Sequence, residues 1–220
     1  MDGRHPLRRL AAALCATALT AAVVAAVAGC TDEKKRYLAE VAPLVAQMEQ
    51  VAADMEAIAA IAIELTKVPE AEQRIGALDE RLRKLTVAFS SLMAPNDFSY
   101  FHANLVKALA SEATGISALR GFVGRTVNAS LLTARLEELR KREAAIDGGI
   151  RDAKPNAPGF EKKKLDQLRA KDELEKLGKQ YQVLKNEMDG QMKYYADNHR
   201  FYKGHLRVYR EAVVKKEKVK

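Results

Sequence analysis

The chain contains no tryptophan, and only 6% of its residues are aromatic. Residues that interrupt helices are also scarce, with 6 prolines and 12 glycines among 220 residues. Ala, Leu, Glu, Lys, Gln and Arg, which are strong helix formers, dominate the remainder. The composition therefore predicts a chain that is helical almost throughout.

Cysteine is rare as well. Both cysteines, Cys15 and Cys30, lie in or directly after an apolar stretch near the N-terminus. If that stretch is removed before Cys30, the remaining chain has a single cysteine at its own N-terminus. An internal disulfide and a cysteine-based zinc site are then excluded.

The common catalytic and cofactor motifs are missing from the sequence. It has no HExxH, no Glu-x-x-His spacing of the kind found in di-iron bundles, no CxxCH, no GxGxxG and no P-loop. A Ser/His/Asp triad is assembled in space and has no fixed spacing, but nothing in the chain points to one. We therefore expect no catalytic residues, no metal site, no cofactor and no enzymatic activity.

The N-terminus has the three parts of a secretory signal peptide. Arg4, Arg8 and Arg9 precede an uncharged run, Leu10 to Ala28, which ends in small residues. The run is long enough for a transmembrane helix to be weighed, but ten of the twenty residues from Leu10 to Gly29 are alanine, so it would insert weakly. These features favour a cleaved signal peptide.

The last four residues of this region, Val27-Ala28-Gly29-Cys30, resemble the lipobox of bacterial lipoprotein precursors. The resemblance covers only the signal peptide and Cys30. It implies that signal peptidase recognises Val27, Ala28 and Gly29, that the Cys30 thiol receives a diacylglyceryl group, and that the new N-terminus is acylated. Because two or more acyl chains anchor a protein stably, we expect a lipid-anchored protein of the bacterial cell envelope. It would sit on the outer or the inner membrane and face the periplasm or the exterior.

An alternative export signal is also present. Arg8-Arg9 allows a twin-arginine signal. Ala11 and Ala12 stand where that signal prefers bulkier apolar residues, so the lipobox interpretation is favoured.

After the signal peptide, apolar residues recur in alternating steps of three and four, the spacing of helices that pack against one another. Breaks at Val68-Pro69, at residues 94–97 and at residues 148–159 separate four such segments. Their seams include Tyr37, Val41, Met48, Val51, Met55 and Ile58; Ile75, Leu78, Leu82, Leu85 and Phe89; Phe98, Leu105, Leu109, Ile116, Leu119 and Val123; and Leu177, Tyr181, Leu184, Met188, Tyr195, Tyr202, Leu206 and Tyr209. The pattern predicts an all-α fold, an antiparallel helical bundle of about four helices with a long C-terminal helix.

These breaks also predict the domain organisation. We expect a signal peptide at residues 1–29, a helical bundle at 30–147, a linker at 148–160, and a long basic helix packed on the bundle at 161–220. A helix of about 50 residues is about 75 Å long, so we expect its end beyond Tyr195 to project from the bundle. Removal of that end would then leave the bundle folded. The regular seams are also compatible with a homo-oligomer.

Small and polar residues interrupt the third and fourth seams. The small residues between Ala108 and Gly124 favour close packing against a neighbouring helix over a membrane-touching element. Glu112 lies near the third seam. A role in fixing the register of the packed helices is favoured for this residue over a role as an acid catalyst. His199 and His205 stand beside aromatic residues. They could sense pH or bind a metal, but packing in an interface is the favoured interpretation.

Charge is distributed unevenly along the chain. Residues 31–150 hold 15 Lys and Arg against 17 Asp and Glu, whereas residues 151–220 hold 19 against 11. The basic end offers six candidate contacts for an anionic partner: Arg200, Lys203, Arg207, Arg210, Lys215 and Lys216. Outside the inner membrane a nucleic acid is not expected, so an envelope protein, an anionic envelope polymer or lipid headgroups fit better. The alternative is a helix end that is merely solvated.

Taken with the lipobox, these features predict a lipid-anchored envelope protein with a structural, adaptor or protein-interaction role. Its anchor is Cys30. The alternative is a helical-bundle module that binds a small molecule or lipid between its helices.

Overall fold

The fold is all-α, as the sequence predicts. The computed structural model describes residues 6–155 and 157–218, and it describes the side chains of residues 32–155 and 157–213. The described residues form α1 (Pro6–Ile61), the short 3-10 helix η1 (Leu65–Lys67), α2 (Val68–Ser90), α3 (Asn96–Arg151) and α4 (Phe160–Lys218). In this part of the chain there are four α-helices and no strand, so the predicted helical bundle with a long C-terminal helix is confirmed.

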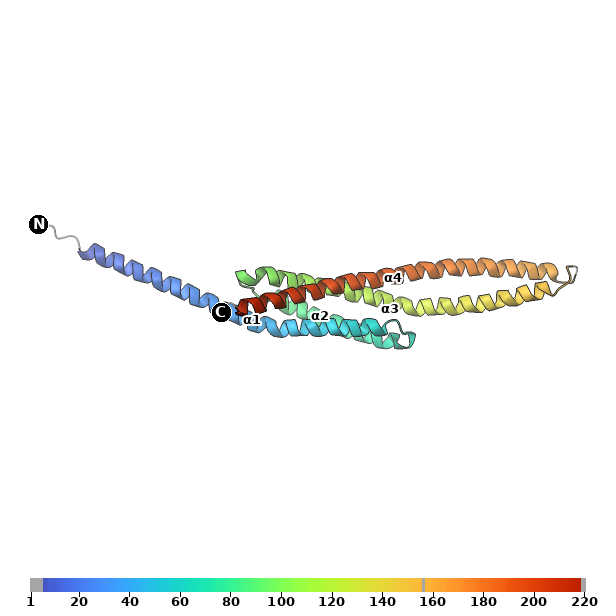
Figure 1. The fold of residues 1–220 in the computed structure, drawn as a ribbon, viewed down its shortest axis with the longest axis horizontal. Helices are drawn as coiled ribbons and strands as arrows, with labels where there is room; N and C mark the ends of the chain where they lie inside the picture. Colours follow the sequence, from blue (N-terminus) through green and yellow to red (C-terminus); the bar gives the residue numbers. More distant parts are fainter. Residues whose placement is uncertain (1–5, 156, 219–220) are drawn as a thin grey trace.

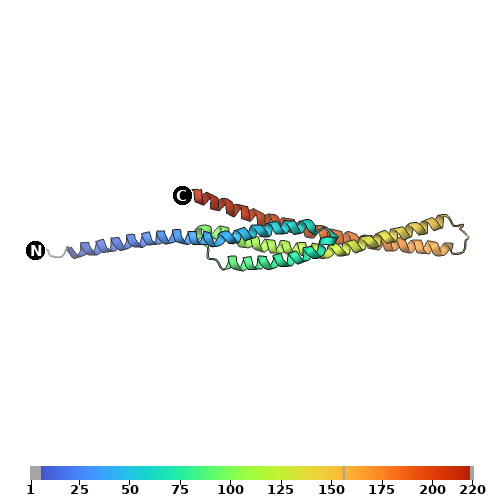
Figure 2. The same ribbon diagram turned by 90° about the horizontal axis from the view of Figure 1, so that it is seen from below.

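The helices form an up-down-up-down bundle in the middle of an elongated molecule, between the protruding N-terminal part of α1 and a hairpin of α3 and α4 (Figures 1 and 2). Asp54 of α1 pairs with Arg81 of the antiparallel α2, and Asp79 of α2 pairs with Arg120 of α3 at 3.0 Å. The core consists largely of residues from the predicted seams, although Leu177, Tyr181 and Leu184 of the fourth seam lie outside it. Its largest fully buried side chains include Met48, Met55 and Ile58 of α1; Ile75, Leu82, Leu85 and Phe89 of α2; Leu105, Leu109, Ile116 and Leu119 of α3; and Tyr202 of α4.

Beyond the bundle, α3 and α4 continue together as a two-helix hairpin (Figure 1). A second, small apolar cluster of Leu136, Leu139 and Leu177 joins the two helices there. Ion pairs join α3 to α4 at Arg125–Glu187, 2.9 Å, next to the start of the hairpin, and at Arg135–Glu173, 2.8 Å, within it. The hairpin is thus narrower than the bundle and has less buried apolar surface to hold it together.

The part of α4 from Tyr195 to Tyr209 does not project but packs in the bundle, so the sequence-based prediction for this segment is wrong. Tyr202 is 0% exposed, and Leu206 and Tyr209 are each 5% exposed in the bundle core. The reason lies in α2, which has only 23 residues and therefore covers only the first part of α3. Because α4 runs antiparallel to α3, its C-terminal part lies beside the first part of α3 and beside α1, and its N-terminal part forms the hairpin.

The connection between α3 and α4 is shorter than the predicted linker. Gly148 and Gly149 belong to α3, and the chain leaves the helix only at Asp152. Two glycines in a helix cost about 1 kcal/mol each relative to alanine. Lys163 of α4 donates a hydrogen bond to the Gly149 carbonyl oxygen at 3.1 Å, so this part of α3 contacts α4. Gly159 precedes α4 with a φ of 85°, a conformation that favours glycine.

The small residues of α3 allow close packing in the bundle. A Cβ atom added at Gly115 would lie 3.6 Å from Met55 of α1 and 3.6 Å from Asn198 of α4. Ala108 and Ala118 are buried on the same helix. The contacts agree with the close-packing interpretation of this segment.

Candidate functional site

A buried polar cluster lies where α1, α3 and α4 meet. The Glu112 side chain of α3 is 0% exposed, although it carries a carboxylate. One of its oxygens, Oε1, lies 2.8 Å from Nδ1 of His199 on α4. The other imidazole nitrogen, Nε2, lies 3.3 Å from Oε1 of Glu56 on α1. One imidazole therefore connects carboxylates from two other helices.

This geometry favours a proton on His199. A neutral imidazole has one N–H donor and an ionised carboxylate can only accept, so an imidazole that donates to two ionised carboxylates carries both of its protons. Burial alone would lower the pKa of His199, but the hydrogen bonds and charges of Glu112 and Glu56 outweigh burial and raise this pKa. The positive imidazolium balances the negative charge that Glu112 brings into the core.

Neighbouring groups hold the imidazole in place. Tyr195 stacks on His199 with ring centroids 5.6 Å apart. Lys203, one turn further along α4, donates a hydrogen bond to the same Glu56 carboxylate. Ser111 of α3 donates a hydrogen bond to the Asn198 side chain at 2.7 Å. Three helices are thus fixed relative to one another by polar contacts in addition to the apolar core.

The second oxygen of Glu112, Oε2, is buried and has no hydrogen-bond partner among the described residues. An unsatisfied buried acceptor costs free energy, so the carboxylate depends on its contact with His199.

Glu56, His199 and Lys203 also line a surface groove of about 660 Å³ on α4. Within the described residues, no group of three or more His, Cys, Asp or Glu side chains could hold a metal ion.

The cluster makes the stability of the bundle depend on pH. The raised pKa means that the folded protein binds the His199 proton more tightly than the unfolded chain does. The contribution of the His199 proton to the free energy of unfolding is complete below about pH 6.5, the ordinary pKa of histidine. This contribution is lost as the pH rises through the raised pKa of His199 in the folded protein. We therefore expect the thermal unfolding midpoint to fall between pH 6 and pH 9, and circular dichroism at 222 nm measures it.

The matched variant for this prediction is Glu112→Gln, which keeps the shape of the side chain and removes its charge. The pH dependence of its unfolding midpoint should be flatter than that of the wild type. A Glu112→Gln profile parallel to the wild-type profile would show that another group causes the pH dependence.

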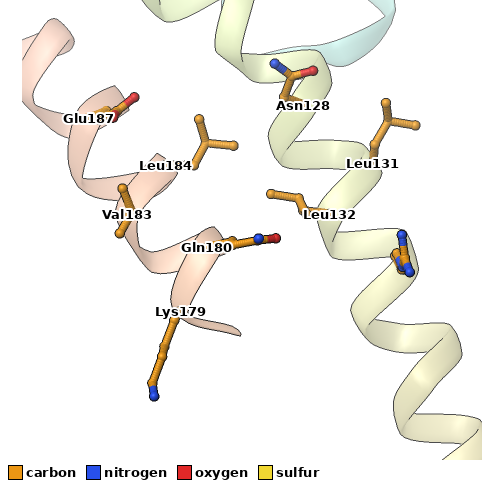
Figure 3. A pocket seen from close by; sticks show the side chains of 9 residues that line it. Asn128, Leu131, Leu132, Lys179, Gln180, Val183, Leu184 and Glu187 are labelled. Atoms are coloured by element: carbon orange, nitrogen blue, oxygen red, sulfur yellow. The ribbon is translucent and has the colours of Figure 1, made fainter. Parts of the chain in front are cut away.

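A second groove, about 730 Å³ in volume, lies between α3 and α4 where the hairpin leaves the bundle (Figure 3). Leu132 of α3 and Leu184 and Gln180 of α4 point into the space between the two helices. Leu131 and Val183, at the edges of the groove, are 65% and 59% exposed. The groove is apolar but open to solvent, and it is the part of the described chain that best fits the alternative of a binding module.

The predicted contacts of the basic helix end divide into two groups. Lys203 and Arg210 face α1, where they pair with Glu56 and Glu49. Arg200 and Arg207 point outward, with side chains 82% and 78% exposed, and among the described residues they pair only with acidic neighbours on α4. The side chains of Lys215 and Lys216 lie outside the described residues, as do those of Val27, Ala28, Gly29 and Cys30.

Sequence reasoning placed Glu112 near the apolar seam but did not find its partner. Glu112 and His199 are 87 positions apart, and no spacing rule connects residues on different helices. His205 lies against Phe201, with ring centroids 4.2 Å apart, so the two histidines of α4 do not form one site. The available signal was a charged residue in an apolar seam, which requires a buried partner of opposite charge.

Comparison of the chain with known protein families, curated proteins and solved structures finds no relative. No protein-family model, no curated protein and no solved structure matches the chain. Among the described residues, no helix is both long and apolar enough to span a membrane.

Proposed function

We propose that this protein is a lipid-anchored component of the bacterial cell envelope with a structural or adaptor role. One observation supports it most: α1 leaves the bundle at the end opposite to the α3–α4 hairpin (Figure 1). A lipid on Cys30 would hold the bundle at a membrane surface and direct the hairpin away from it. The hairpin would then be the part that reaches a partner.

The dimensions suit this role. Cys30 precedes the first core residue, Tyr37, by seven residues, which is about 10 Å of helix. The bundle would therefore stand close to the membrane. Residues 127–151 of α3, which form one side of the hairpin, add about 38 Å beyond the bundle.

The basic end of α4 lies at the anchor end of the bundle. Val213 near the end of α4 and Leu38 near the start of the bundle line the same groove. Arg207 and Arg210 would thus lie near the headgroups of the membrane that holds the anchor. Attraction between these cations and anionic lipids supports anchoring by acyl chains. An envelope protein or an anionic envelope polymer is the expected partner further out.

The anchor is tested by the Cys30→Ser substitution. We expect wild-type protein from the membrane fraction to have the mass of a chain that starts at Cys30 plus its acyl groups, because the thiol is the site of lipid attachment. The Cys30→Ser protein should lack that mass and be lost from the membrane fraction. Intact mass spectrometry and fractionation measure both results.

Cys15→Ser is the matched control and should leave the mature mass unchanged. A full-length wild-type protein without acyl groups would contradict the proposal and make Leu10 to Ala28 an uncleaved segment.

The alternative, a module that binds a small molecule or lipid, is supported by the groove lined by Leu132 and Leu184. A bound molecule that appears in the native mass spectrum and dissociates on denaturation would favour that alternative.

A further inference from the structure

The far end of the hairpin carries a concentration of positive charge. Residues 140–171, which include the end of α3, the connecting loop and the start of α4, hold ten Lys and Arg against five Asp and Glu. Six of these cations have no ion-pair partner among the described residues: Arg140, Lys141, Arg142, Arg151, Lys154 and Lys162. All six are exposed. The cations at this end are therefore available to an external anionic partner.

Two exposed leucines lie among these cations on α4. Leu165 is 48% exposed and Leu168 is 64% exposed, whereas Ala170 is buried against α3. At 100° per residue, both leucines point outward, away from the side of Ala170. Lys164 lies on one side of them, and Lys162 and Arg169 lie on the other. The outward face of residues 162–169 is thus an apolar strip with a cation on each side.

The apolar strip of Leu165 and Leu168 does not continue along the rest of α4. Asp172 and Glu175 continue the outward face after Leu168, and they pair with Lys176 and Lys179 at 2.6 Å. The local pairs at the tip are longer: Lys164–Glu161 is 3.6 Å and Arg169–Asp166 is 3.9 Å. Lys185 and Lys193, further along α4, also have no ion-pair partner among the described residues. What distinguishes the tip of the hairpin is therefore the apolar strip with a cation on each side.

We propose that the hairpin tip is a binding surface for an anionic lipid bilayer. The cations attract anionic headgroups, while leucines between lysines can enter the boundary between headgroups and acyl chains. The stems of the flanking lysines can extend along an apolar surface and keep their charges at headgroup level. A soluble polyanion would use the cations but would gain nothing from Leu165 and Leu168. The proposal goes beyond the lipid anchor, because the tip lies at the opposite end of the molecule and would bind without acylation.

The test uses the full chain with Cys15→Ser and Cys30→Ser, which removes both native thiols and any lipid attachment. Leu168→Cys in this background is labelled with the environment-sensitive fluorophore NBD. Val87→Cys, which replaces an exposed residue on α2 (70% exposed), is the control position. The probes are vesicles of equal parts phosphatidylglycerol and phosphatidylcholine, and vesicles of phosphatidylcholine alone.

We expect a blue-shifted and brighter emission from position 168 with the anionic vesicles, and no change from position 87. Combining Lys162→Gln, Lys164→Gln and Arg169→Gln should weaken this response at least about tenfold in lipid concentration, since each cation near the surface adds to binding. The matched control combines Lys176→Gln, Lys179→Gln and Lys185→Gln, which removes equal charge from the same helix. That control should keep most of the response.

Unchanged emission at position 168 with anionic vesicles would overturn the proposal. So would an equal response with phosphatidylcholine alone, or an equal loss in the two charge variants. Sedimentation with the anionic vesicles while emission at position 168 stays unchanged would assign the cations to headgroup or polyanion contact without insertion, which also contradicts it. None of these results depends on Cys30, so failure at the tip is distinct from failure of the anchor.

Discussion

The substitution His199→Ala should lower the free energy of unfolding by about 3–5 kcal/mol, the usual cost of leaving a buried charge without its partner. Glu112 is 0% exposed and its second oxygen has no hydrogen-bond partner, so no other described group can replace the imidazole at 2.8 Å. Glu56 would lose a contact as well, but it is half exposed and retains Lys203. Urea denaturation followed by circular dichroism measures the loss.

A double variant separates the charge from the packing. Glu112→Leu combined with His199→Leu removes both members of the pair and fills their place with apolar side chains. Because a buried ion pair costs desolvation energy, this variant should be more stable than His199→Ala alone. Arg200→Ala, at an exposed neighbouring position, is the control and should change stability by about 0.5 kcal/mol or less. If His199→Ala had as small an effect as Arg200→Ala, the cluster would not hold the bundle together.

Truncation after Asp197 should abolish the cooperative unfolding of the bundle. It removes His199 and the buried side chains of Tyr202, Leu206 and Tyr209. Loss of each large buried side chain costs about 2–5 kcal/mol. The summed loss is comparable to the whole free energy of unfolding of a typical domain, about 5–15 kcal/mol. The Met48 carbonyl oxygen also loses the 2.8 Å hydrogen bond from Tyr202. We expect a broad thermal transition and rapid proteolysis of the remaining chain.

Truncation after Val213 is the matched control for this experiment. It removes the terminal lysines, including Lys215 and Lys216, but leaves every described core residue of α4 in place. The bundle should then unfold cooperatively, with a midpoint close to that of the full chain. A cooperative transition after truncation at Asp197 would show that α1, α2 and α3 form a stable unit without the end of α4.

The helices and most of their buried faces could be predicted from the sequence. The second seam shows this clearly: Ile75, Leu78, Leu82, Leu85 and Phe89 are all buried in α2. Periodicity of three and four residues fixes which side of a helix is apolar, whatever the helix packs against. Gly148 and Gly149 misled the prediction of a helix end, because α3 continues through both glycines to Arg151.

The candidate site could be predicted only in part. Glu112 stood out as a charge near an apolar seam, but its bond to His199 depends on how α3 and α4 are aligned. A seam specifies a face of a helix and leaves its lengthwise alignment open. For α4 this choice decides whether Tyr202 is buried or projects, and the sequence-based expectation was the wrong one of the two.

The sequence by itself determined the helical class, the buried face of each helix and the lipobox resemblance at Cys30, because these depend on composition and on residues near one another in the chain. The tertiary structure alone decided that the bundle forms at the C-terminal end of α4, since α2 is short and packs beside only the first part of α3. It also decided that Glu56, Glu112 and His199 meet, and that the hairpin places its cations at the far end. These outcomes depend on contacts between segments that are distant in the chain. Such contacts form only when the lengths of the helices and their lengthwise alignment are compatible with one another.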